Sequence, residues 1–268
     1  MISNVYRVIA AALLVLLAAP AIPAQVAPSA NARPITLDHV VFAVNDLEAV
    51  AARFRSFGFA LKPGRPHENG IRNEHVKFRD GTELELLTAP AARDELTTTY
   101  RRHLAAGDGP AFLALMARPA PPPEFDAPAY IFFGGRNASP TDRPEHFAHA
   151  NTAESLVAVW LAGADLSRER ALLARYGSVT SDRPRRLLGF DATVMRVGDG
   201  GAVYLLPANA GLHADRPIVG VTFRVRDLAA AARVLKQAGV AVQTSGAESL
   251  LLAPGVTGGI WIELRGES

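Results

Sequence analysis

The sequence predicts an α+β fold made of paired β-α-β-β-β modules, with curved mixed sheets around a cleft and one module decayed. The main observation is an internal repeat: the segment 40–47 recurs without a gap 181 positions later as 221–228, with Val, Phe, Val, Asp and Leu in the same places. Each copy leads from an alternating apolar strand through a helix into short strands. Such self-similarity indicates a fold assembled from duplicated units.

The N-terminal residues 1–24 are typical of a secretory signal peptide. Arg7 supplies the positive charge, an apolar run follows at 8–19, and small residues lead to an expected cleavage after Ala24. The run is shorter than the roughly 20 residues that a spanning helix needs. We therefore expect a periplasmic or secreted protein with no stable membrane insertion after cleavage, the alternative being an uncleaved anchor. Residues 25–36 are expected to form a flexible mature N-terminus.

An Asp followed by a Gly twelve residues later marks a helix in three modules. The Asp is placed to accept the free amide hydrogens of the first helical turn, and the Gly can adopt the left-handed conformation that ends a helix. These pairs are Asp46 with Gly58, Asp165 with Gly177, and Asp227 with Gly239.

Short strands are expected after each helix. In the first module, 37–88, the Asp80-Gly81 pair predicts a tight hairpin. The last module spans 217–264 and the third spans 151–207. The expected strands are 59–62, 74–78 and 82–87 in the first, 193–197 and 202–206 in the third, and 240–243, 249–253 and 259–264 in the last.

Between the first and third modules, residues 89–150 are expected to be a linker that contains a degenerate module. Residues 93–104 favour a helix and 111–116 favour a strand. The prolines between 119 and 128 oppose the helix that a complete module would have there.

The alternation of residues in the first module predicts which side chains face the cleft. If Val40 and Phe42 pack under the helix, His39 must lie on the opposite face of the sheet. By the same argument Glu85, which stands between two leucines, points to that open face. A curved sheet around a cleft is where a small ligand would bind.

Composition excludes several classes of chemistry. The chain has no cysteine, so thiolate nucleophiles, disulfides and thiolate metal sites are excluded, and a net charge of +2 gives no support for nucleic-acid binding. No G-x-S-x-G, Walker A or H-E-x-x-H motif is present.

Three segments resemble the vicinal oxygen chelate superfamily, which includes glyoxalase I, extradiol dioxygenases and bleomycin-resistance proteins, and more closely its glyoxalase-like branch. They are Leu-Asp-His-Val-Val at 37–41, His-Glu-Asn-Gly-Ile-Arg-Asn at 67–73 and Leu-Glu-Leu at 84–86. The resemblance implies a divalent metal ion (Zn, Mn, Ni or Fe) that polarises oxygens of a small oxygenated molecule while a glutamate moves a proton. The implied enzyme is a lyase, an isomerase or a dioxygenase-type protein.

Carried over residue by residue, the resemblance implies His39 and Glu85 as metal ligands, with Glu85 also catalytic. Glu263 matches Glu85 in the last module and is a further candidate ligand, the alternative being a solvated strand end. His149, in an H-x-x-H pair with His146, is a further candidate ligand.

The other modules depart from this pattern. Ala158 and Gly220 stand where His39 would recur, so a complete four-ligand set is missing. This departure favours the alternative of a metal-free protein that binds or sequesters a small molecule, in the manner of the bleomycin-resistance relatives.

Substrate contacts are expected from the segment around Gly70. His67 is a candidate substrate contact or extra ligand, Arg72 could hold a carboxylate, and Asn73 could bind substrate or stabilise a turn. We expect His75 to be an ordinary surface residue.

Overall fold

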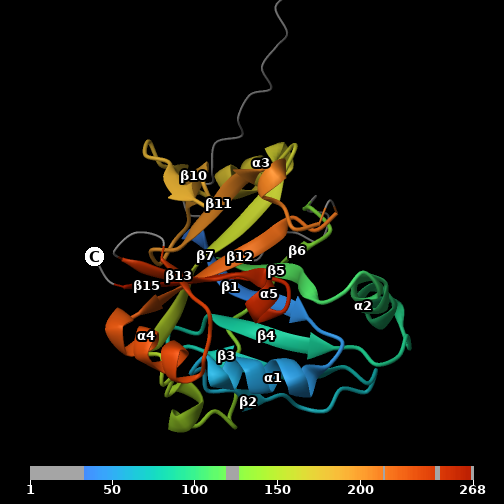
Figure 1. The fold of residues 1–268 in the computed structure, drawn as a ribbon. Helices are drawn as coiled ribbons and strands as arrows, with labels where there is room; N and C mark the ends of the chain where they lie inside the picture. Colours follow the sequence, from blue (N-terminus) through green and yellow to red (C-terminus); the bar gives the residue numbers. More distant parts are fainter. Residues whose placement is uncertain (1–32, 119–126, 214, 245–247, 267–268) are drawn as a thin grey trace, which may run out of the picture.

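The computed structural model describes residues 33–118, 127–213, 215–244 and 248–266, which form two open mixed sheets (Figure 1). The expected signal peptide, 1–24, lies outside the described residues, and so do 25–32 of the expected flexible N-terminus. Within the described ranges, no helix is both long enough and apolar enough to span a membrane.

The first sheet combines the first module with the degenerate one. Strand β1 pairs in parallel with β4 and antiparallel with β5, so the segment expected as a linker completes the sheet. In sheet order the strands are β2 (Lys62–Pro63), β3 (Arg72–Lys77), β4 (Glu83–Thr88), β1 (Arg33–Ala43), β5 (Gly109–Arg118) and β6 (Ile131–Phe133). Residues 119–126, where prolines argue against a helix, lie outside the described residues.

The second sheet is built from the third and last modules by the same rules. Strands β12 and β15 are parallel, β7 and β11 are parallel, and β12 joins β7 antiparallel. In sheet order the strands are β13 (Gln243–Thr244), β14 (Ser249–Leu252), β15 (Trp261–Gly266), β12 (Ile218–Val225), β7 (Ala153–Gly163), β11 (Ala202–Pro207), β10 (Phe190–Arg196) and β8 (Val179–Thr180), with β9 (Arg185–Leu187) paired to β10.

The helices begin largely where the acid-to-glycine spacing places them. They are α1 (Leu47–Ser56), α2 (Glu95–Ala105), α3 (Ser167–Arg175), α4 (Leu228–Gln237) and the short α5 (Pro254–Thr257), together with 3-10 turns at Pro144–Phe147 and Ala208–Ala210. Asp46 and Asp227 each accept a hydrogen bond from the amide three residues later. In α3 the expectation is corrected by one residue: Leu166 is the N-cap, and Asp165 accepts from the Ser167 amide instead.

The alternation predicted for the first module is confirmed by the core. Val40 and Phe42 are fully buried, and they share one apolar cluster with Phe54 of α1. Figure 1 shows α1 alongside β3 and β4, the strands whose apolar side chains it covers. That cluster continues into the second sheet, where the Phe223 ring lies 5.3 Å from the ring of Phe59 between centroids.

The sequence predicted that the opposite face of the first sheet would be open, but a helix covers part of this face. Val41 and Leu87 pack against Tyr100 and Leu104 of α2, the helix expected at 93–104. Helix α2 therefore covers one end of this face, and the end that carries His39 stays open to a cavity.

Candidate functional site

A cavity of about 690 Å³ lies on the face of the first sheet that is turned away from α1. Strands β1 to β4 form its floor, and the segments 64–67 and 135–141 form its walls. Its polar lining residues are His39, Lys62, Arg65, His67, Asn73, His75, Glu83, Glu85, Arg136, Asn137, Ser139 and Thr141. Four residues expected from the sequence are thereby brought together: His39, His67, Asn73 and Glu85.

His39 lies between two carboxylates. Its Nε2 is 3.8 Å from Oε2 of Glu85, and its Nδ1 is 3.5 Å from Oδ2 of Asp38. Burial by itself would lower the pKa of His39, but Asp38, Glu85 and Glu83 together raise that pKa above its ordinary value. The arrangement therefore favours a charged imidazolium facing the Glu85 carboxylate.

Asp38 was not anticipated as part of this site. Its side chain is 1% exposed, and neither carboxylate oxygen has a hydrogen-bond partner among the described residues. The strand register shifts between Leu37 and His39, which lets these neighbours escape strict alternation. A buried carboxylate without hydrogen bonds is costly, so its charge is compensated mainly through the adjacent imidazole.

Glu85 is oriented from the neighbouring strand. The side-chain amide of Asn73 donates to Oε1 of Glu85 at 2.6 Å, which leaves Oε2 directed at His39. Gly64 permits this approach, because a Cβ on it would lie 1.7 Å from Oδ1 of Asn73. The Asn73 Oδ1 atom and the Nε2 of His67 are both buried without a hydrogen-bond partner in the described residues.

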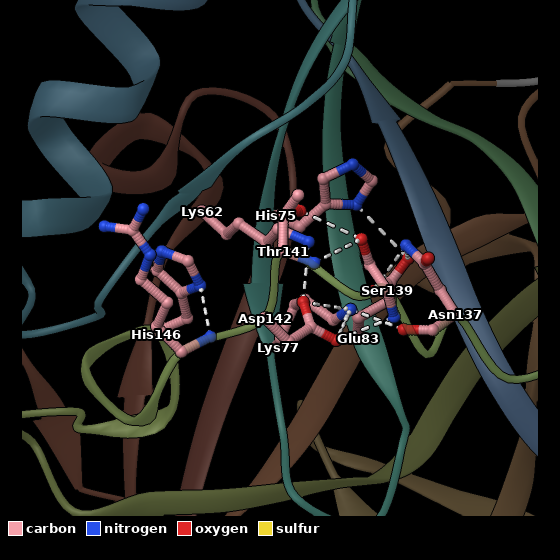
Figure 2. A network of polar contacts seen from close by, with 10 residues as sticks. Lys62, His75, Lys77, Glu83, Asn137, Ser139, Thr141, Asp142 and His146 are labelled. Atoms are coloured by element: carbon pink, nitrogen blue, oxygen red, sulfur yellow. Dashed lines mark hydrogen bonds and ion pairs between the residues drawn. The ribbon is translucent and has the colours of Figure 1, made fainter.

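A buried polar network fixes one wall of the cavity (Figure 2). The ammonium groups of Lys62 and Lys77 lie 2.6 and 2.9 Å from the Asp142 carboxylate. At the other end, His75 Nδ1 donates to Glu83 at 3.2 Å, and the Asn137 amide donates to the same carboxylate. These bonds hold the segment 137–142 against β2, β3 and β4.

The network corrects the expectation that His75 is a surface residue, because the structure buries it in contact with Glu83. A sequence signal for it existed. His75 pairs with Glu85 across the hairpin, so the alternation that turns Glu85 into the cleft also turns His75 into it. The two ammonium groups lower the pKa of Asp142 well below its usual range, although burial opposes them.

Three expected site residues lie elsewhere. The first, Arg72, is an exposed residue at the start of β3, and its guanidinium pairs with Glu48 of α1. It does not line the cavity. The expectation of a substrate-binding arginine is therefore not met by this side chain.

The second, His149, is a structural residue and not a metal ligand. The Ala60 amide donates to its Nδ1 at 3.0 Å, and its Nε2–H donates to the Lys77 carbonyl at 2.9 Å. Its ring is packed against Phe59 and Phe78. Both nitrogens are thus occupied, and burial lowers the pKa of His149, which keeps the imidazole neutral.

The third, Glu263, belongs to the second sheet and is fully buried. It faces Thr222 across parallel strands, as Glu85 faces Val41, so the repeat equivalence with Glu85 is confirmed in three dimensions. Its partners differ, however. Arg185 donates to it at 2.6 Å, and the Thr222 hydroxyl donates at 2.8 Å.

The donor set in the first cavity falls short of a metal centre. No three His, Cys, Asp or Glu side chains in the described parts of the chain are placed to hold one ion. His39 and Glu85 are two suitable donors, and His67 and Asn73 line the same cavity.

Comparison with known proteins places this geometry in context. Residues 37–217 match a family model described as the glyoxalase-like domain. No functionally curated protein matches the sequence.

Among solved structures, a 4-hydroxymandelate synthase variant from Streptomyces coelicolor superimposes with a TM-score of 0.64 at 15% identity, over 88% of this chain and 93% of that one. Catechol 2,3-dioxygenase gives a TM-score of 0.53 at 12% identity, over 87% of both chains. The 2,3-dioxygenase LapB from Pseudomonas sp. KL28 gives 0.54 at 11% identity, over 88% of this chain and 92% of that one. These identities show a shared fold alone. Since the family model covers more than half of the sequence, the chain belongs to the glyoxalase-like domain family of the vicinal oxygen chelate superfamily.

Proposed function

We propose that this protein is an enzyme that transfers a proton on a small oxygenated molecule in the first-sheet cavity. The observation that carries the proposal is the Asp38–His39–Glu85 arrangement, in which a carboxylate and an imidazole face each other at 3.8 Å in a polar cavity. A base and an acid at that separation can act on neighbouring atoms of one substrate.

Each residue has a distinct part in such a reaction. Glu85, held by Asn73, accepts a proton from the carbon next to a substrate carbonyl through Oε2. His39, charged because of its carboxylate neighbours, donates from Nε2 to the carbonyl oxygen as negative charge develops there. Asp38 stabilises the imidazolium from the Nδ1 side. Return of the proton from Glu85 to the adjacent carbon, while a hydroxyl proton of the enediol passes back to His39, completes an isomerisation and restores both residues.

The cavity favours a substrate that carries an anionic oxygen. Arg136 lines it, and the buried Nη1 of this guanidinium has no hydrogen-bond partner in the described residues. Lys62 reaches the same wall. The ring of Phe132 meets His39 edge to face at 5.5 Å. A small oxo acid or hydroxy acid would match this combination of a cation and proton-transfer groups.

The metal-dependent form of the proposal uses the same residues. A divalent ion (Zn, Mn, Ni or Fe) would take His39 and Glu85 as ligands, with His67 of the same cavity as the candidate third donor, and would polarise substrate oxygens.

The test is exchange of carbon-bound hydrogen in deuterated water, followed by NMR over a panel of small oxo and hydroxy acids. We expect catalysed exchange by the wild type and a decrease of about 100-fold or more in Glu85→Gln and in His39→Gln. Glu145→Gln, at the exposed 3-10 turn, is the matched control and should retain full activity. Exchange that survives both cavity substitutions would overturn the proposal.

A thermal-shift series with each metal tests whether the cavity residues bind a metal ion. A metal-dependent rise in the melting temperature that disappears in both cavity variants establishes the metal-dependent form, since only the folded chain holds the site. Saturable ligand binding in this cavity without exchange of any panel member would instead establish the sequestering protein.

We also propose export to the periplasm or the medium, supported by Arg7 and the apolar run at 8–19. Mass spectrometry of the protein from a periplasmic fraction should give a mature chain that starts between Ile22 and Arg33. Recovery of the chain with Met1 in the cytosol would contradict this.

A further inference from the structure

The second sheet carries a cavity of its own, of about 650 Å³, on the face turned away from the shared core. The charged residues that line it are strongly unbalanced, with five arginines and a single acidic residue, Glu248. The arginines are Arg183, Arg185, Arg186, Arg196 and Arg265. Such an excess of positive charge around one concave site is unlike the mixed charge of the first cavity.

Most of this charge is not neutralised by nearby carboxylates. Arg186 pairs with Asp191 at the surface. Arg265 donates to the hydroxyl of Tyr204 at 2.9 Å, a neutral partner. The side chains of Arg183 and Arg196 make no ion pair within the described residues. Three guanidinium groups thus face the cavity without a carboxylate.

Arg185 is held rigidly at the floor of the cavity. Its Nη2 donates to the fully buried Glu263, and its guanidinium carbon lies 5.9 Å from the centre of the Tyr204 ring. Its Nε atom is buried with no hydrogen-bond partner in the described parts of the chain. A guanidinium fixed in this way adds positive charge beside the cavity at little entropic cost.

At the repeat positions of His39 and Glu85, the second sheet carries Gly220 and Glu263. Gly220 occupies the position of His39, and a Cβ there would lie 2.3 Å from the Trp160 ring. That ring also donates through Nε1 to the Thr222 hydroxyl at 2.9 Å. The indole therefore fills the place of an imidazole, while Glu263 serves to hold an arginine.

We propose that the second-sheet cavity binds a small organic anion with at least two negatively charged oxygens, a dicarboxylate or a phosphate monoester. Guanidinium groups recognise both through paired N–H···O contacts. Val157, Val194 and Ala202 supply an apolar lining for the carbon skeleton. The cavity has the size of ordinary small-molecule sites.

The test is isothermal titration calorimetry of the purified protein at low ionic strength with phthalate, phenyl phosphate and, as a neutral counterpart, benzamide. We expect saturable binding of at least one dianion and none of benzamide. The Arg196→Gln/Arg265→Gln double variant should bind about tenfold more weakly or worse, because two charge-assisted contacts are lost. Arg101→Gln on α2 removes the same charge outside both cavities and should bind like the wild type.

Further measurements identify the class of ligand and keep the test valid if the double variant misfolds. Tighter binding of phthalate identifies a carboxylate ligand, and tighter binding of phenyl phosphate identifies a phosphate ligand. If the double variant unfolds, Arg196→Gln alone, at an exposed position, should still weaken binding. Absence of dianion binding, equal binding of benzamide, unchanged affinity in the arginine variants, or loss of binding in Glu85→Gln would each overturn the proposal.

Discussion

At the scale of single residues, surroundings decide what each histidine does. His39 faces carboxylates on both sides, whereas His149 accepts from one backbone amide and donates to one carbonyl among phenylalanines. The surroundings therefore raise the pKa of His39 and lower that of His149, although the side chain is the same. The H-x-x-H spacing that suggested a metal ligand at His149 carries no information about these tertiary partners.

The burial of neutral His149 predicts a pH dependence of stability. Its folded-state pKa is lowered by burial, so the unfolded chain binds a proton more readily. Its contribution to the free energy of unfolding is therefore complete above the unfolded pKa of about 6.5, and is lost as the pH falls below that value. Urea unfolding of the wild type and of His149→Gln should be measured between about pH 8 and about pH 5. We expect the free energy of unfolding to decrease less toward low pH in the variant than in the wild type. Parallel curves for the two proteins would contradict this assignment.

At the scale of elements, the helices differ in how their N-termini are capped. Asp46 and Asp227 cap α1 and α4 directly, while α3 starts two residues after Asp165, with Leu166 as N-cap. The acid-to-glycine spacing is the same in all three, so spacing alone does not determine the cap.

Alanine at each acidic residue tests this difference. Asp46→Ala and Asp227→Ala should each lower the free energy of unfolding by about 1 kcal/mol, because an amide of the first turn loses its acceptor. Asp165→Ala should cost clearly less, since it caps no helix directly. Chemical denaturation of the three variants measures the differences, and equal losses would show that Asp165 acts as a true cap.

The sequence predicted those parts of the fold that depend on local pattern. The alternation around Phe42 and Glu85 gave the correct faces of β1 and β4. The contribution of Asp38 could not be predicted, because a register shift beside it changes its direction. The wall made by Asn137 and Asp142 depends on contacts with residues far away along the chain, which no local pattern encodes.

At the scale of the whole molecule, the two sheets share one core. Besides the phenylalanine contacts, the Leu156 amide donates to the Thr82 hydroxyl, and the Gly198 amide donates to the Ile35 carbonyl at 2.7 Å. Each of these bonds joins the first sheet to the second. We therefore expect the described parts of the chain to unfold as one cooperative unit.

A substitution in one sheet should accordingly be felt in the other. Phe42→Ala in β1 removes a fully buried ring and should lower the free energy of unfolding by about 3–5 kcal/mol. Both tryptophans, Trp160 and Trp261, lie in the second sheet. In Phe42→Ala, the denaturant midpoint measured by tryptophan fluorescence should fall by the same amount as the midpoint measured by far-UV circular dichroism.

The control is Leu96→Ala, which truncates a side chain that is 47% exposed. This variant should leave the free energy of unfolding nearly unchanged. Tryptophan fluorescence that keeps its wild-type midpoint in Phe42→Ala would show that the sheets unfold separately.

The position of Phe223 also affects how the protein folds as it is synthesised. Its ring packs against Phe59 and Phe78, which lie in the first module, although Phe223 itself belongs to β12. A nascent chain that ends before β12 leaves those two rings without their partner and exposes them to water. The first module, although translated first, therefore completes its core only after β12 has emerged from the ribosome.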